Sequence, residues 1–92
     1  MIVNGHDHDY ERFARQDTAG AASSTGIRQF VVGNGGAELR ALNSPKPNSE
    51  YRDNEHYGIL LLTLRAGSYE WAFIATDGAI YDRSSAAEAC HE

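Results

Sequence analysis

The most regular hydrophobic pattern in the chain lies in its second half. Residues 57–65 carry apolar side chains on both faces of a strand, and a second apolar and aromatic run follows at residues 69–75. Because successive side chains of a strand point to opposite faces, three aromatic residues of the second run share one face: Tyr69, Trp71 and Phe73. The short segment 66–68 contains glycine and joins the two runs. This pattern predicts an antiparallel hairpin over residues 57–76.

Three further segments have the composition of strands. Residues 27–32 are β-branched and aromatic, and they stop at residues 33–36, where three glycines permit positive φ. Residues 1–4 form a short apolar run, which predicts a buried strand that leads into a loop. Residues 80–81 follow a turn signal and predict a last short strand.

The remaining segments are polar or broken. Residues 17–26 are small and polar, residues 43–55 contain both prolines, and the tail 84–92 is polar and rich in alanine. We expect loops in the first two and weak structure in the tail. Residues 37–42 have room for one helical turn. The sequence therefore predicts one small, mainly antiparallel β chain of about four or five strands, with little helix.

The apolar run at residues 57–65 has a consequence for packing. Leu60, Leu62 and Leu64 point one way, whereas Ile59 and Leu61 point the other. Burial of each such side chain contributes roughly 1.5–3 kcal/mol, so leaving one row in water is costly. No segment has the pattern of an amphipathic helix that could cover the second row. We therefore expect a partner chain, self-association or a missing portion of the same domain to cover it.

Composition and charge narrow the classes of partner. The chain has 92 residues and a formal net charge of −5, which argues against nucleic acid and anionic membranes as general partners. It has no apolar run long enough to span a bilayer, and no segment with the pattern of a signal peptide. Cys90 is the only cysteine, so it is either a free thiol or half of a disulfide whose partner lies elsewhere.

Chemistry concentrates near the N-terminus, in residues 4–13. In an extended backbone, His6 and His8 point to one side and Asp7 to the other. Neutral imidazole is a common metal ligand, and Gly5 permits a close approach of the backbone. Two ligands do not complete a zinc site, which needs three or four. On the residues alone, the alternative is a loop with two hydrogen-bonded histidines and no metal.

The residues Gly-His-Asp-His-Asp-Tyr-Glu-Arg at positions 5–12 resemble the last metal-binding motif of the calcineurin-like metallophosphoesterases, in particular of their purple-acid-phosphatase-like branch. Four later blocks continue the resemblance in family order: 26–36, 57–64, 68–73 and 90–91. The Gly-His-x-His core is a weak signal alone, whereas the core extended by Tyr-Glu-Arg and followed by these blocks is specific. The resemblance implies the C-terminal part of an α/β/β/α sandwich.

By this resemblance, the complete enzyme is a two-metal phosphoesterase that hydrolyses phosphate esters with a metal-bound hydroxide. His6 would bind one metal ion and His8 the other, the ions being divalent or mixed-valence Fe, Zn or Mn. Asp9 or a backbone carbonyl could orient an imidazole by a hydrogen bond, with Asp7 and Asn4 as further neighbours of the ligands. Three matching residues are expected to be structural rather than catalytic: Tyr10, Glu11 and Arg12.

The family's other ligands lie in earlier Asp-x-His, Gly-Asp and Gly-Asn-His motifs, none of which occurs in these 92 residues. Asn34 lacks the histidine that would follow it in such a motif, and we expect His56 and His91 to be non-ligands. We therefore interpret residues 1–92 as a single, incomplete C-terminal segment without a confident catalytic residue of its own. A missing N-terminal half would complete it and would also contain the usual disulfide partner of Cys90.

The alternative is a non-catalytic β module that self-associates and binds metal only weakly through His6 and His8. Relatives in this branch are often exported, to the outside of the cell or to the periplasm, but the sequence of residues 1–92 does not identify the compartment of the parent protein. The two interpretations differ in whether the histidines belong to a larger metal centre.

Overall fold

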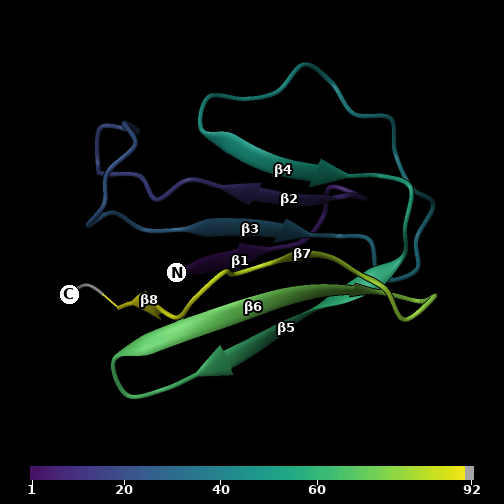
Figure 1. Cartoon of the computed structure of the whole chain (residues 1–92). Coiled ribbons are helices and arrows are strands. Elements are labelled where there is room, and N and C mark those ends of the chain that lie inside the picture. The colour runs from purple at the N-terminus through teal and green to yellow at the C-terminus, as the bar shows by residue number, and fades with distance from the viewer. Residues whose placement is uncertain (91–92) are drawn as a thin grey trace.

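The computed structural model describes residues 1–90, which form two small β-sheets and no helix. In chain order the strands are β1 (Ile2–Asn4), β2 (Tyr10–Phe13), β3 (Gln29–Val32), β4 (Ser49–Asp53), β5 (Gly58–Leu64), β6 (Ser68–Ala75), β7 (Ile80–Arg83) and β8 (Glu88–Ala89). The first sheet has the order β1-β3-β2-β4, and the second has the order β5-β6-β7 with β8 also paired to β6 (Figure 1). The predicted fold class, mainly β and mostly antiparallel, is confirmed.

The first sheet carries the candidate metal motif at one of its ends. β1 runs parallel to β3, whereas β2 runs antiparallel to β3 and to β4. Because β1 and β2 flank β3 in opposite directions, the connection 5–9 between them turns back at the end of β3. The backbone N–H of Gly33, just after β3, donates to the carbonyl oxygen of Asp9 at 2.9 Å. The segment that follows β3 therefore lies against the motif.

The second sheet is built on the β5–β6 hairpin, whose register pairs Gly58 with Ala75 and Leu64 with Tyr69. Alternate residues of β6 are buried, starting at Tyr69, as the period of two predicts. The turn between β6 and β7 contains Gly78 at φ 86°, a left-handed conformation that glycine adopts without a steric penalty.

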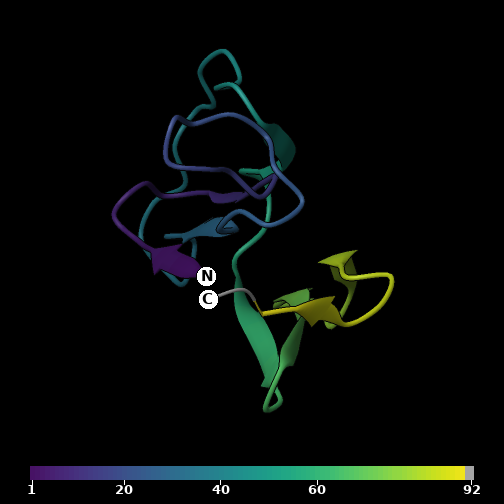
Figure 2. The same ribbon diagram turned by 90° about the vertical axis from the view of Figure 1, so that its left-hand side faces the viewer.

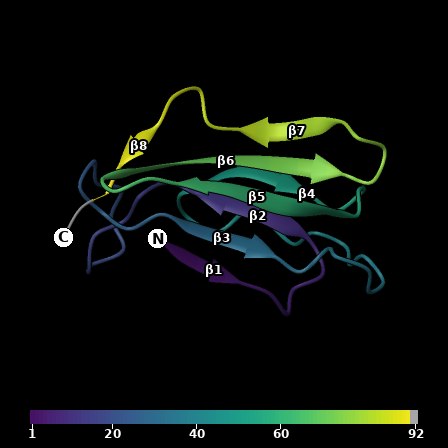
Figure 3. The ribbon, with the colours of Figure 1, turned by 90° about the horizontal axis from the view of Figure 1, so that it is seen from below.

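The two sheets form separate layers (Figure 2), and β6 runs roughly along the direction of the strands β2 and β4 of the first sheet (Figure 3). An aromatic core fills the space between them. Tyr10 of β2 stacks on Phe73 of β6 with ring centroids 4.3 Å apart, and Phe30 of β3 meets the edge of Trp71 at 5.5 Å. Aromatic side chains bury large areas, so these few residues supply much of the core.

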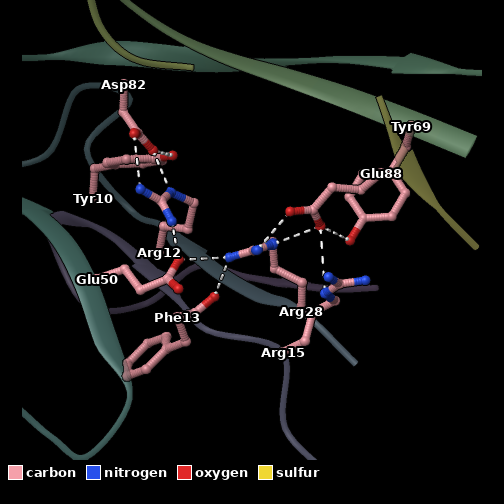
Figure 4. A network of polar contacts seen from close by, with 9 residues as sticks. All are labelled: Tyr10, Arg12, Phe13, Arg15, Arg28, Glu50, Tyr69, Asp82 and Glu88. Atoms are coloured by element: carbon pink, nitrogen blue, oxygen red, sulfur yellow. Dashed lines mark hydrogen bonds and ion pairs between the residues drawn. The ribbon is translucent and has the colours of Figure 1, made fainter. Parts of the chain in front are cut away.

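Two arginines join the layers through a polar network that we call the arginine clamp, composed of Arg12, Arg28, Glu50, Asp82 and Glu88 (Figure 4). Arg12 of β2 binds both carboxylate oxygens of Asp82 in β7, at 2.8 and 3.1 Å. Arg28, just before β3, binds both carboxylate oxygens of Glu88 in β8, at 3.0 and 2.7 Å. Glu50 of β4 accepts from both arginines. The clamp therefore fastens β7 and β8 to the first sheet.

Within the clamp, burial and charged hydrogen-bond partners shift the pKa of Glu88 in opposite directions. Burial raises the pKa of Glu88, but hydrogen bonds from Arg28 and Tyr69 outweigh it, so the pKa lies below its ordinary value. The guanidinium carbons of Arg28 and Arg12 lie 4.8 and 5.4 Å from the centroid of the Trp71 ring, close enough for cation–π attraction. These contacts compensate for removing the arginines from water.

Three strands of residues 1–90 were not predicted: β2 lies in the metal-motif segment 4–13, which was predicted as a loop, and β4 and β8 lie where the sequence predicts irregular structure. β4 falls in the predicted loop 43–55, because polar partners rather than hydrophobic alternation hold it to β2. Glu11 of β2 accepts a hydrogen bond from Ser49 at 2.6 Å and forms an ion pair with Arg52 at 3.3 Å. β8 falls in the tail predicted to have weak structure, where the clamp fixes Glu88. The prediction of four or five strands was therefore too low for residues 1–90.

Two other local predictions, for residues 1–4 and for residues 37–42, differ from the structure. Residues 1–4 do form a strand, but Ile2 and Val3 are 47% and 49% exposed, so the strand is not buried. Within the described part of the chain, β1 is an edge strand that pairs with β3 alone. Residues 37–42 contain no helical turn. Within residues 1–90, no helix is long and apolar enough to cross a membrane.

The apolar strand β5 is covered along part of one face only. Leu60 and Leu62 pack against the aromatic core, whereas Leu64 on the same face is 66% exposed. On the other face, Ile59 and Leu61 are 60% and 50% exposed. We call Ile59 and Leu61 the outer row. Nothing in residues 1–90 covers the outer row. The expectation that a partner chain, self-association or a missing portion of the domain covers it stays a prediction.

Candidate metal-ligand loop

The candidate ligands lie in residues 5–9, the connection between β1 and β2, which we call the histidine loop. This segment bends, and His6 has φ 79°. The extended backbone assumed for His6 and His8 is therefore wrong, and alternation no longer predicts which way the two side chains point. A non-glycine residue at positive φ costs free energy and persists only where its surroundings impose it.

Gly33, just after β3, allows the histidine loop to pack closely on the first sheet. A Cβ atom at position 33 would lie 1.7 Å from the carbonyl oxygen of Asp7 and 3.4 Å from the backbone nitrogen of His8. The sequence assigned the close approach to Gly5, but a Cβ atom there would meet its nearest atom, the carbonyl oxygen of Val32, at 3.8 Å. The close backbone contact therefore requires glycine at position 33 and not at position 5.

The His8 side chain is held in one orientation by the segment after β3. Its Nδ1 donates to the carbonyl oxygen of Glu38 at 2.7 Å, and its backbone carbonyl accepts from the N–H of Arg40 at 3.2 Å. In a neutral ring that donates from Nδ1, Nε2 is an acceptor with a free lone pair. Histidines that bind metals are commonly oriented by such a hydrogen bond. The geometry therefore leaves His8 able to bind a cation through Nε2.

His6 differs from His8 in its contacts. Its side chain is exposed, and its ring has no hydrogen-bond partner within residues 1–90. The alternative of a loop with two hydrogen-bonded histidines therefore describes only His8. The residue that orients His8, Glu38, was not identified from the sequence, because it contributes its backbone carbonyl from 30 positions away.

The polar residues expected beside the ligands make other contacts. Within the described residues, Asn4, Asp7 and Asp9 form no hydrogen bond to either imidazole. Asn4 accepts a hydrogen bond from the side chain of Gln29 at 2.9 Å. The Oδ1 atom of Asp9 is buried and has no hydrogen-bond partner among residues 1–90. Burial, followed by the charges of Glu11 and Asp7, raises the pKa of Asp9. Asp9 therefore holds a proton more readily than an exposed aspartate.

The residues that follow the histidine loop belong to the packing of β2. The Tyr10 ring is fully buried in the aromatic core, and its hydroxyl donates to Asp82 at 2.8 Å. Arg12 is part of the arginine clamp, and Glu11 binds side chains of β4. The side chains of Tyr10, Glu11 and Arg12 are therefore used in packing and in polar contacts between strands.

The donor set of the histidine loop is incomplete. Within residues 1–90, no group of three or more His, Cys, Asp or Glu side chains could hold a metal ion. His56 instead donates from Nδ1 to Asp53 at 2.8 Å, and Cys90 is an exposed free thiol. His91 lies outside the described residues. A metal centre that uses His6 and His8 would therefore require further ligands.

Comparison of the chain with family models, with curated proteins and with solved structures finds no match. The resemblance to metallophosphoesterases therefore depends on the motif residues and their order.

Proposed function

We propose that this chain supplies His6 and His8 to a two-metal phosphoesterase centre, as the C-terminal segment of a complete domain. The observation that carries the proposal is the 2.7 Å hydrogen bond from His8 Nδ1 to the carbonyl oxygen of Glu38, which leaves Nε2 free for a cation. His6 adds a second, exposed imidazole on the same loop. Its positive φ is a strained conformation of the kind that concentrates at functional sites.

The number of donors limits what these residues do by themselves. A zinc ion needs three or four ligands, whereas the histidine loop offers two imidazoles. The remaining ligands would come from the portion that contains the family's earlier motifs. Two divalent or mixed-valence ions of Fe, Zn or Mn would supply charge stabilisation for the attacking and leaving oxygens of a phosphate ester. Residues of this chain would bind and orient, and they carry no reaction step alone.

Two uncovered surfaces support an incomplete domain. β1 is an edge strand with exposed apolar side chains, and an edge strand offers unpaired backbone N–H and C=O groups. The outer row on β5 is also exposed, although its burial would be favourable. An α/β/β/α sandwich would cover such surfaces with further strands and helices.

We expect Zn²⁺ added to this chain to reach the histidine loop before the other histidines. In an NMR titration of the imidazole nitrogens, the signals of His6 and His8 should change at the lowest Zn²⁺ concentration. Substitution His8→Ala should weaken Zn²⁺ binding by about tenfold or more, because it removes the oriented ligand. His56→Gln is the matched control, since His56 is paired with Asp53 and lies outside the loop.

Equal affinity of His8→Ala and His56→Gln for Zn²⁺ would contradict the assignment of the ligands. Activity is measured in the joined protein, after a preceding portion with the Asp-x-His, Gly-Asp and Gly-Asn-His motifs is added. The joined protein should hydrolyse an aryl phosphate in a metal-dependent reaction that His6→Ala and His8→Ala each abolish. Hydrolysis that survives both substitutions is incompatible with the proposal.

Self-association is a second candidate function, which the exposed outer row favours. We expect the isolated chain to form concentration-dependent oligomers in sedimentation velocity experiments, because association would remove apolar surface from water. The double substitution Ile59→Ser, Leu61→Ser should shift the chain to the monomer. Leu64→Ser is the control, because Leu64 is 66% exposed on the same strand but belongs to the alternate row. A chain that is monomeric at every concentration would exclude this function.

A further inference from the structure

The connection between β4 and β5 carries the chain from one layer to the other (Figure 2), and His56 lies in it. Nδ1 of His56 donates to Oδ2 of Asp53 at the end of β4, at 2.8 Å. The imidazole ring also stacks on the ring of Tyr81 in β7, with centroids 3.9 Å apart and planes 22° apart. One titratable side chain therefore contacts the last residue of a strand in the first sheet and a strand of the second.

Both partners of His56 are themselves held in place. The second oxygen of Asp53 accepts the backbone N–H groups of Glu55 and His56, at 2.9 and 3.0 Å. The Tyr81 hydroxyl donates to Asp77 in the β6–β7 turn, at 2.8 Å. Because Asp53 and Tyr81 are held in fixed positions, a change of charge on His56 changes the strength of its contacts with both residues.

A third contact holds the His56 backbone itself. The buried Asn34 side chain donates from Nδ2 to the carbonyl oxygen of His56, at 2.9 Å. Asn34 is the second residue after β3, so the end of this strand also fixes the position of His56.

We propose that His56 is a pH-sensitive joint between the two sheets, whose charged form holds β7 against the β4–β5 connection more firmly than its neutral form. The charged groups that face His56 are all acidic: Asp53 from β4, Glu55 from its own segment and Asp77 from the β6–β7 turn. Tyr81 of β7 is the other titratable group, and the face of its ring attracts a cation. These acidic groups and the Tyr81 ring stabilise an imidazolium ion at this position, and they outweigh the opposing effect of its partial removal from water.

The direction of the effect follows from the pKa. The hydrogen bond to Asp53, followed by the charges of the neighbouring acids, raises the pKa of His56 above its ordinary value. The stabilisation is therefore complete below the pKa of the unfolded chain, about 6.5, and is lost as the pH rises through the raised value of the folded protein. The neutral ring retains stacking and its Nδ1 donor, so the joint loosens and the sheets stay folded. The proposal is independent of the metal role of the histidine loop.

The experiment measures urea unfolding of the full chain by circular dichroism, from about pH 5.5 to about pH 8.5, the range in which histidines titrate. The unfolding midpoint of the unaltered protein should fall as the pH rises. His56→Gln retains a hydrogen-bond donor but does not titrate, and it should remove roughly half or more of that fall. Arg65→Met is the control, because Arg65 is 52% exposed on the surface and an arginine stays charged over this pH range. This control should keep the fall.

An equal fall in His56→Gln and in the unaltered protein would overturn the proposal. If His56→Gln does not fold, two measurements on the unaltered protein test the proposal instead. The His56 ring should titrate above about 6.5, and amide exchange in β7, corrected for its intrinsic pH dependence, should accelerate relative to β2 as the ring loses its proton. Titration of His56 at or below that value, or an unchanged ratio of exchange rates, would also overturn it.

Discussion

Substitution Arg28→Met is expected to destabilise the protein by about 3 kcal/mol, because it removes one partner from a buried charged network. The Arg28 side chain is only 7% exposed. Without it, Glu88 and Glu50 lose charged partners, and the carbonyl oxygen of Phe13 loses a donor at 2.6 Å. Domains of this size are stabilised by roughly 5–15 kcal/mol in total, so the loss is a large share.

Urea unfolding followed by far-UV circular dichroism measures this effect. Arg65→Met is the matched control, because Arg65 pairs with Glu70 on the surface, where its side chain is 52% exposed. An exposed ion pair contributes at most about 1 kcal/mol, so the control should change stability little. If the two arginine variants unfold at the same urea concentration, the clamp does not hold the layers together.

Substitution Gly33→Ala is expected to cost about 1–3 kcal/mol and to displace the histidine loop, because the added methyl group overlaps backbone atoms that have no free rotation. The Cβ atom would lie 1.7 Å from the carbonyl oxygen of Asp7 and 2.6 Å from its carbonyl carbon. Relief of this overlap requires the loop to move away from β3. The backbone amide signals of residues 6–9 should therefore shift in NMR spectra, together with a lower urea midpoint.

Gly35→Ala provides the control for the Gly33 substitution. A Cβ atom at position 35 would meet nothing within 4 Å, and Gly35 does not have a positive φ. Its stability should therefore stay within about 0.5 kcal/mol of the unaltered protein, the usual range for surface substitutions. Unchanged loop signals and equal stability of the two alanine variants would show that the close contact at Gly33 is not required.

The elements that were predictable from the sequence are those that short-range rules specify. The β5–β6 hairpin and β3 follow from apolar or β-branched runs between turn residues. The inward face of β6 follows from the period of two, since Tyr69, Trp71 and Phe73 alternate along one strand. By contrast, β4 and β8 have no such pattern, because Ser49, Arg52 and Glu88 are held by charged or polar side chains that are distant in the sequence.

The candidate site divides in the same way. Two closely spaced histidines could be recognised as potential ligands because the types and spacing of side chains are local properties. The orientation of His8 could not be predicted from the sequence. It depends on a backbone carbonyl 30 positions away, and any residue type could supply that carbonyl. The sequence also could not predict which glycine lies at the close backbone contact of the histidine loop. Gly5 and Gly33 both lack a side chain, and only the packing of the loop distinguishes them.

A small antiparallel β fold, the aromatic face of its hairpin and two candidate imidazole ligands can thus be inferred from the residues and their spacing. The folded chain adds which strands pair, which hydrogen bond orients His8, and that Arg28 and Glu88 meet across 60 positions. Turns and side-chain alternation depend on neighbouring residues, whereas ion pairs, backbone contacts and exposure depend on which distant segments the fold brings together. The exposure of the outer row and of the edge strand β1 is also a property of the tertiary structure, because no segment of residues 1–90 packs over them.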